Sequence, residues 1–187
     1  MLIGDPSVFA VESVITVAYE RLSFRALGLF VIHLGSRRYG VYEPDATMLA
    51  VSFDTVERRI RERGNHVAAF SSEENPAKVA KAFRETVYGT DRQRDFFGLT
   101  ADKFRSSVSD VQWAPDGDEA FDDGSYVLQF DVGDRVRLIA FKSSSDGSYD
   151  PASLTEIWIT SDNFYSVLEC WHSSFLEEWT SLPKVAA

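Results

Sequence analysis

The side chains that most often carry catalysis or bind metals are few in this chain. Its 187 residues include one cysteine, Cys170, and three histidines, His33, His66 and His172. A nucleophilic cysteine needs a histidine base within hydrogen-bond reach, but Cys170 stands beside Trp171 in an apolar helical pattern, which predicts a buried, packed thiol. No histidine lies at metal-ligand spacing from a second kind of ligand. We therefore predict no catalytic residue, no metal site and no cofactor.

Longer catalytic and cofactor motifs are absent as well. The sequence has no Gly-x-Gly-x-x-Gly or Gly-x-x-x-x-Gly-Lys-Ser/Thr phosphate loop, no Gly-x-Ser-x-Gly elbow and no His-Glu-x-x-His helix. An EF-hand loop beginning at Asp116 fails, because Phe121 replaces the required glycine and Val127 the bidentate glutamate. A small enzyme without recognisable motifs would need a pocket with convergent titratable groups.

Acidic residues are concentrated in the second half of the chain. Residues 95–187 carry 6 Lys and Arg against 17 Asp and Glu, whereas residues 1–94 carry 13 against 12. Such a field repels nucleic acid and membrane surfaces and favours a basic partner. Between Arg105 and Arg135 there are acids and aromatic residues but no Lys or Arg. The candidate partner-binding residues there are Asp110, Asp116, Asp118, Glu119, Asp122, Asp123, Asp131, Asp134, Trp113, Phe121 and Tyr126.

Acids around aromatic anchors suit the recognition of a basic protein surface. The charge speeds association, and the aromatic contacts carry much of the affinity. The alternative is a solvated loop whose aromatic side chains pack back into the core, because acidic surfaces also keep proteins in solution.

Runs of β-branched and aromatic residues predict two groups of strands that would position this region. The first group is expected to form an antiparallel meander, and the second to contain a tight hairpin at Val132-Gly133-Asp134. The segment Ser109–Gly124 between the groups is expected to be a loop. The predicted strands are Val8–Tyr19, Leu27–Leu34, Arg38–Tyr42, Met48–Phe53, Ser125–Asp131, Arg135–Lys142 and Leu154–Thr160.

Helical periodicity predicts helices between and after the strands. One follows Asp54 as far as Arg63, one spans Pro76–Tyr88, and shorter pieces cover Asp91–Phe97 and Ala101–Val108. The clearest helix follows a Ser161 cap and ends before Pro183, with an apolar stripe of Phe164, Val167, Leu168, Trp171, Phe175 and Trp179. The sequence thus predicts an α+β fold, in which an antiparallel sheet packs against several helices including an amphipathic C-terminal helix.

Length and hydropathy predict one domain over residues 1–187 in the cytoplasm. A chain of this size buries roughly 70% of its unfolded surface, so it needs no disulfide. The amino terminus lacks a basic region ahead of an apolar run, and the apolar stretch Leu27–Leu34 is far shorter than the ~20 residues of a membrane span.

Short motifs at both ends resemble the immunity protein 42 family. They are the opening MLIGDPSVFAV, the strand segment Gly28–Ile32 followed by Gly35 and Arg38-Tyr39, the hairpin segment Val136-Arg137-Leu138, and Glu156–Ile159 leading to Phe164-Tyr165. The resemblance implies a bacterial immunity protein that binds and neutralises a polymorphic toxin without catalysis. It assigns no residue to the toxin contact.

An acidic inhibitor suits a basic toxin such as a nuclease, whose groove must attract phosphates. The resemblance thus makes a cognate toxin the expected partner, and the acidic charge implies that no nucleic acid or membrane is bound. An adaptor for another cellular protein is the alternative, which gene neighbourhood would distinguish. The sequence does not decide between a monomer and a homodimer.

Overall fold

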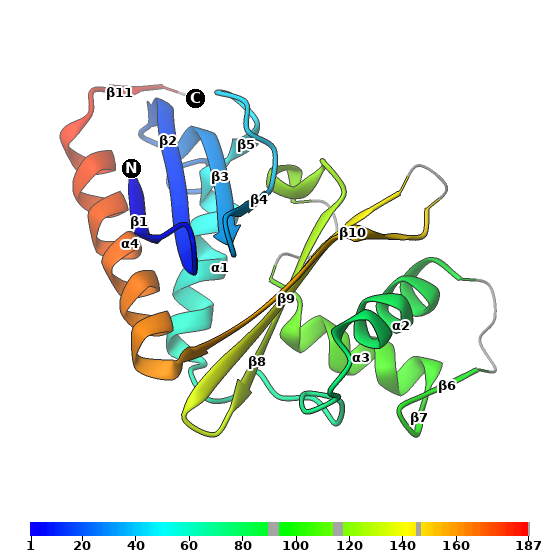
Figure 1. The fold of residues 1–187 in the computed structure, drawn as a ribbon. Coiled ribbons are helices and arrows are strands. Elements are labelled where there is room, and N and C mark those ends of the chain that lie inside the picture. The colour runs from blue at the N-terminus through cyan, green and yellow to red at the C-terminus, as the bar shows by residue number, and fades with distance from the viewer. Residues whose placement is uncertain (90–93, 114–117, 145–146, 187) are drawn as a thin grey trace.

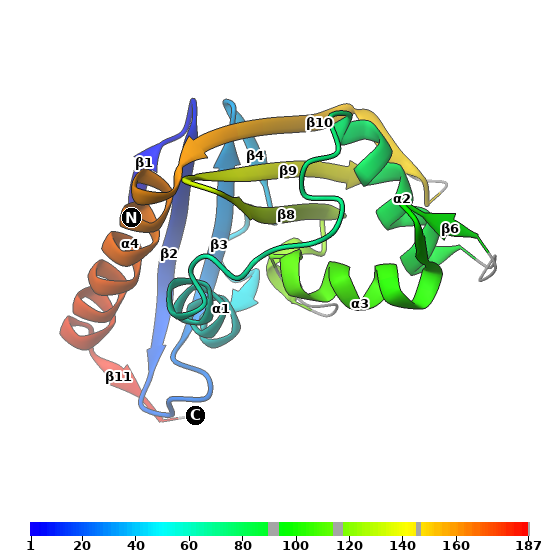
Figure 2. The same cartoon turned by 90° about the horizontal axis from the view of Figure 1, so that it is seen from below.

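The computed structural model describes residues 1–89, 94–113, 118–144 and 147–186. A central three-stranded sheet separates two unequal parts. One part contains the amino-terminal strands with helices α1 and α4, and the other contains helices α2 and α3 (Figure 1). The view from below shows the same division (Figure 2). The architecture is α+β with mainly antiparallel sheets, as the sequence predicted.

The first group of strands forms a six-stranded sheet, here named the N-terminal sheet. β2 pairs with β3 along most of its length, and β1 pairs with the first residues of β2. β4 and β5 both pair with β3, while β11 adds a short parallel pairing at the end of β2. The strands are β1 (Leu2–Asp5), β2 (Phe9–Tyr19), β3 (Ala26–Leu34), β4 (Arg37–Tyr39), β5 (Thr47–Met48) and β11 (Lys184–Val185).

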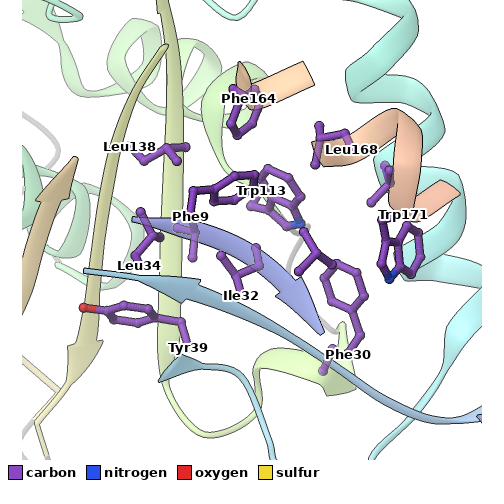
Figure 3. Close-up of a cluster of buried hydrophobic side chains, with 14 of the residues drawn as sticks. Phe9, Phe30, Ile32, Leu34, Tyr39, Trp113, Leu138, Phe164, Leu168 and Trp171 are labelled. Atoms are coloured by element: carbon purple, nitrogen blue, oxygen red, sulfur yellow. The ribbon is translucent and has the colours of Figure 1, made fainter. Parts of the chain in front are cut away.

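Two helices, α1 (Leu49–Arg61) and α4 (Ser161–Ser181), cover one face of this sheet. Alternate residues of β3 point toward them, so that Phe30 meets Trp171 edge-on with ring centroids 5.2 Å apart. Trp113, which precedes the central sheet in the sequence, packs beside both Phe9 and Phe164, whose rings also contact each other (Figure 3). These residues belong to one apolar cluster, here named the first core.

The central sheet is buried on both faces along most of its strands β8 and β9. It consists of β8 (Ser125–Val132), β9 (Arg135–Ser143) and β10 (Tyr149–Thr160), in the order β10-β9-β8. Successive side chains of a strand point to opposite faces. In β9, Leu138 therefore enters the first core and its neighbour Ile139 enters a second core on the other side.

The second core is formed by α2 (Pro76–Tyr88) and α3 (Ala101–Val111) against the central sheet. It is rich in phenylalanine: Phe70 stacks on Phe104 with ring centroids 4.6 Å apart. A two-stranded sheet of β6 (Asp95–Phe96) and β7 (Leu99–Thr100) adds Phe96 to the cluster.

A buried polar network joins the end of α1, β8 and α4. The Asp131 carboxylate accepts hydrogen bonds from the backbone N–H groups of Gly64 (2.9 Å) and His66 (3.1 Å) and from the Tyr165 hydroxyl (3.0 Å). Nδ1 of His66 lies 2.9 Å from the same carboxylate. Burial raises the pKa of Asp131, but these hydrogen bonds and the nearby imidazole outweigh it, so the pKa lies below its ordinary value.

Two buried arginines extend these polar contacts. The Arg59 guanidinium lies over the Trp113 ring and donates to the Gln129 side chain (3.3 Å), and burial lowers the pKa of Arg59 to about 9. On the other face of the sheet, Arg137 donates to Glu156 (2.7 Å) and to the Ser71 carbonyl (2.9 Å).

The structure differs from the predicted elements in several short segments. A helix begins at Leu49, where a strand was predicted over Met48–Phe53, because Leu49, Phe53 and Val56 fall on one helical face toward the first core. A short helix was predicted over Asp91–Phe97, but residues 95 and 96 form a strand, and residues 91–93 lie outside the described residues. The strands β1 and β11 were not predicted, and the cap of α4 is Thr160 and not Ser161.

Cys170 was expected to be buried but is exposed on α4. The buried stripe of this helix runs through Leu168, Trp171 and Phe175, and Cys170 falls outside it. No helix among the described residues is both long and apolar enough to cross a membrane.

Because both cores share the central sheet, we expect the whole chain to unfold in one transition. Leu138→Ala removes a side chain from the first core and Ile139→Ala one from the second, so each should cost about 2–5 kcal/mol. Urea unfolding followed by fluorescence and by circular dichroism should give coincident single transitions for both variants. Two separate transitions in Ile139→Ala would contradict this expectation.

The lowered pKa of Asp131 predicts a specific loss of stability in acid. The unfolded carboxyl binds protons more readily than the folded one. The stabilisation is therefore present above the ordinary carboxyl pKa of about 4 and disappears as the pH falls through the folded pKa. Asp131→Asn should lower the free energy of unfolding by about 1–3 kcal/mol at pH 7 and flatten its dependence on pH below about 4. Asp134→Asn, at an exposed position nearby, should change stability little.

Candidate partner-binding surface

The candidate partner-binding residues do not form one continuous loop surface. Asp110 lies near the end of α3, residues 118–123 surround the 3₁₀ helix η1 (Glu119–Phe121), and Asp131 and Asp134 lie at the far end of β8. At about 3.3 Å per residue, the two ends of β8 are roughly 25 Å apart. Asp116 lies outside the described residues.

Three of the candidates are buried and have internal partners. Trp113 is only 1% exposed in the first core, and Asp131 belongs to the polar network described above. Asp118 caps η1 by accepting a hydrogen bond from the Ala120 N–H (3.0 Å). Burial raises the pKa of Asp118, while this hydrogen bond lowers it to a smaller extent. In this structure, these three side chains stabilise the fold.

The two other aromatic candidates are half-buried. Phe121 meets Phe30 edge-on, with ring centroids 6.4 Å apart. The Tyr126 hydroxyl accepts a hydrogen bond from Arg84 (2.8 Å), and the Tyr126 ring stacks on Phe141. Both rings therefore pack inward, as the alternative interpretation of this stretch anticipated.

The exposed acids of η1 remain as surface candidates. Glu119 and Asp122 are exposed, whereas the half-buried Asp123 forms an ion pair with Lys142. Asp110 and Asp134 are exposed as well, but each stands apart from η1. Of the described acidic candidates, only Glu119 and Asp122 thus lie together on the surface with unpaired charges.

A cleft of about 650 Å³ lies beside η1, next to the connection between β4 and β5. The Val41 N–H donates to the Ala120 carbonyl (2.8 Å) and holds this connection against η1. The lining includes neither histidine nor cysteine, and Lys142 is paired with Asp123. The lining residues are Arg37, Arg38, Tyr39, Gly40, Val41, Tyr42, Glu43, Asp123, Lys142 and Ser153.

The β4–β5 connection also contributes to this surface, although the sequence did not predict it. Tyr42, Glu43 and Asp45 are all exposed there. The two acids give no charge signal in the sequence, because basic residues balance the acidic ones across residues 1–94. The triplet Glu43-Pro44-Asp45 does predict an exposed turn here, since residues of these types favour turns.

The histidines have separate partners. Nε2 of His33 lies 2.8 Å from Glu12, and Nδ1 of His66 lies 2.9 Å from Asp131. Burial lowers the pKa of His172, which stacks on a phenylalanine ring. Within the described ranges, no three His, Cys, Asp or Glu side chains gather as a metal site would require.

Comparisons with known proteins agree with this architecture. A crystal structure of CdiI from Burkholderia dolosa AUO158 superposes with a TM-score of 0.55 at 18% sequence identity, covering 93% of this chain and 99% of that one. This likeness shows a shared fold. A search among curated proteins gave no match.

The family assignment comes from the sequence itself. The family model of immunity protein 42 matches residues 1–174, which span both parts of the fold and the central sheet between them. That range takes in the N-terminal sheet up to β5, η1 and most of α4. The chain therefore belongs to the immunity protein 42 family, and its function is that of an immunity protein, which neutralises a cognate toxin.

Proposed function

We propose that this immunity protein acts as a stoichiometric, non-catalytic inhibitor and that the exposed acids of η1 face a basic surface of its toxin. The observation that carries the proposal is the exposure of Glu119 and Asp122 on a rigidly held turn. Among the described residues neither forms an ion pair, so both charges are available to a partner.

The charge distribution supports a basic partner. The formal net charge is −10, and the excess of acids falls in residues 95–187. Long-range attraction between opposite charges raises association rates, and an inhibitor benefits when it captures a toxin quickly. A toxin that acts on nucleic acid fits this description, because its own groove must attract phosphates.

The backbone around η1 suits a preformed contact. Asp118 caps η1 from inside, and the Val41 N–H fixes the neighbouring connection. A surface that is already ordered loses little conformational entropy on binding, so more of the interaction energy remains as affinity. A stable complex would bury about 1,600 Å² in total, so η1 would form only part of the interface.

Titration of toxin activity distinguishes binding from catalysis. With the cognate toxin domain, activity should fall in proportion to added immunity protein and reach its minimum at a fixed molar ratio. Inhibition should also be reversed when the complex is dissociated. If an amount of immunity protein far below one equivalent inactivated all of the toxin and left it chemically altered, the immunity protein would be an enzyme.

Reversal of the η1 charges should slow the association with the toxin. We expect Glu119→Lys/Asp122→Lys to reduce the association rate constant about tenfold at low ionic strength, with a smaller difference at 0.5 M salt because salt screens exposed charges. Stopped-flow fluorescence would measure both rates. Glu169→Lys/Glu177→Lys, on the exposed side of α4, makes the same change in net charge and serves as the control. If both double variants associated equally slowly, the cause would be the change in net charge and not the position of the charges at η1.

A further inference from the structure

One face of the N-terminal sheet is not covered by α1 or α4. Phe9 and Val11 of β2 point into the first core beneath these helices. The alternate residues of β2 must then point to the opposite face. Val14, on that face, is 39% exposed.

Glu12 lies on this second face, two residues before Val14. One of its carboxylate oxygens accepts a hydrogen bond from the Tyr42 hydroxyl (2.9 Å), and the other lies 2.8 Å from Nε2 of His33. The guanidinium of Arg38 lies over the Tyr42 ring, 3.9 Å from the ring centroid. These contacts hold the Tyr42 ring in place although it is 47% exposed.

Exposed apolar side chains surround Glu12. Leu2 is its direct cross-strand partner in β1, and Val14 is the next residue of β2 on the same face. Directly opposed residues and residues two apart on one strand are neighbours on a sheet face. Three exposed apolar side chains thus lie around one fixed carboxylate: Leu2, Val14 and Tyr42. Isolated exposed apolar residues are common on protein surfaces, but a group of them indicates an interaction site.

The rim of this face is acidic. Asp45 accepts a hydrogen bond from Thr16 of β2 (2.6 Å), and the exposed Glu43 stands beside Tyr42. The cleft beside Tyr42 continues the surface toward η1 with its two exposed acids. Acids therefore outnumber the two arginines, Arg37 and Arg38, at this edge.

We infer that the toxin docks on this face, with Tyr42 and Val14 as apolar anchors and the acidic rim facing basic groups of the toxin. A hydrophobic centre with a polar rim is the usual plan of a protein interface, and a rigid tyrosine is a frequent anchor. A second copy of the chain is a poorer occupant, because a two-fold contact would bring the acidic rim against itself. The inference rests on the proposed function and extends its interface from η1 onto the sheet.

Binding to the toxin domain encoded beside the gene, inactivated by a substitution in its active site, tests this docking face. By calorimetry we expect Tyr42→Ala and Val14→Lys each to weaken binding at least about tenfold, as anchor truncation and an intruding charge should. Tyr42→Phe keeps the ring and should remain within about threefold of the wild type. Val51→Lys places the same charge at an equally exposed valine on α1 and should bind like the wild type. Circular dichroism and thermal unfolding of each variant would establish that it is folded.

The outcomes separate this inference from the proposed function. If the unsubstituted protein does not bind the toxin domain, the proposed function itself is wrong. If it binds, and Tyr42→Ala and Val14→Lys bind equally well, the docking face is wrong while the function stands. A loss in Tyr42→Phe as large as in Tyr42→Ala would contradict the anchoring role of the ring. If the variants instead dissociate a dimer in sedimentation and leave toxin binding unchanged, the face serves a second copy and the inference is overturned.

Discussion

Burial of the central sheet on both faces is the constraint on which the rest of the structure depends. An antiparallel sheet can leave one face to water, but β8 and β9 have apolar side chains on both, so each face needs a cover. The N-terminal sheet and α4 cover one face, and α2 with α3 cover the other. The central sheet therefore holds the two parts of the molecule together, because each part covers only one of its faces.

The same constraint explains why the polar residues of β8 and β9 are so fully partnered. Gln129, Asp131 and Arg137 alternate with apolar residues in the buried parts of these strands, and an unpartnered polar group there costs free energy. Asp131 therefore binds the chain after α1 as well as α4, and Arg137 binds the segment before α2. Acidic residues that look alike in the sequence thus divide into those that stabilise the fold and those that remain on its surface.

Sequence patterns predicted the elements with strong periodicity and failed where the tertiary structure decided. The stripe of α4 and the long strands β2, β3, β8 and β9 were found because their apolar spacing is regular. The apolar run at residues 48–53 suits a strand or a helix equally, and only its packing against the first core selects the helix. Among the candidate surface residues, Glu119 and Asp122 are exposed, whereas contacts with residues far along the chain bury Trp113 and Asp131, which local patterns in the sequence do not predict.

The position of Tyr42 follows from the way the N-terminal sheet is covered. Both α1 and α4 pack on the first-core side of the N-terminal sheet, whereas the β4–β5 connection places Tyr42 against Glu12 on the other side. That connection is too short to cover β1 and β2, so apolar side chains stay exposed around Glu12. Glu12 in turn holds the Tyr42 ring in place, so that the ring would lose little conformational entropy when it contacts a partner. A protein that works by occupying a partner's surface needs such a rigid, uncovered face, and this topology provides it beside the acids of η1.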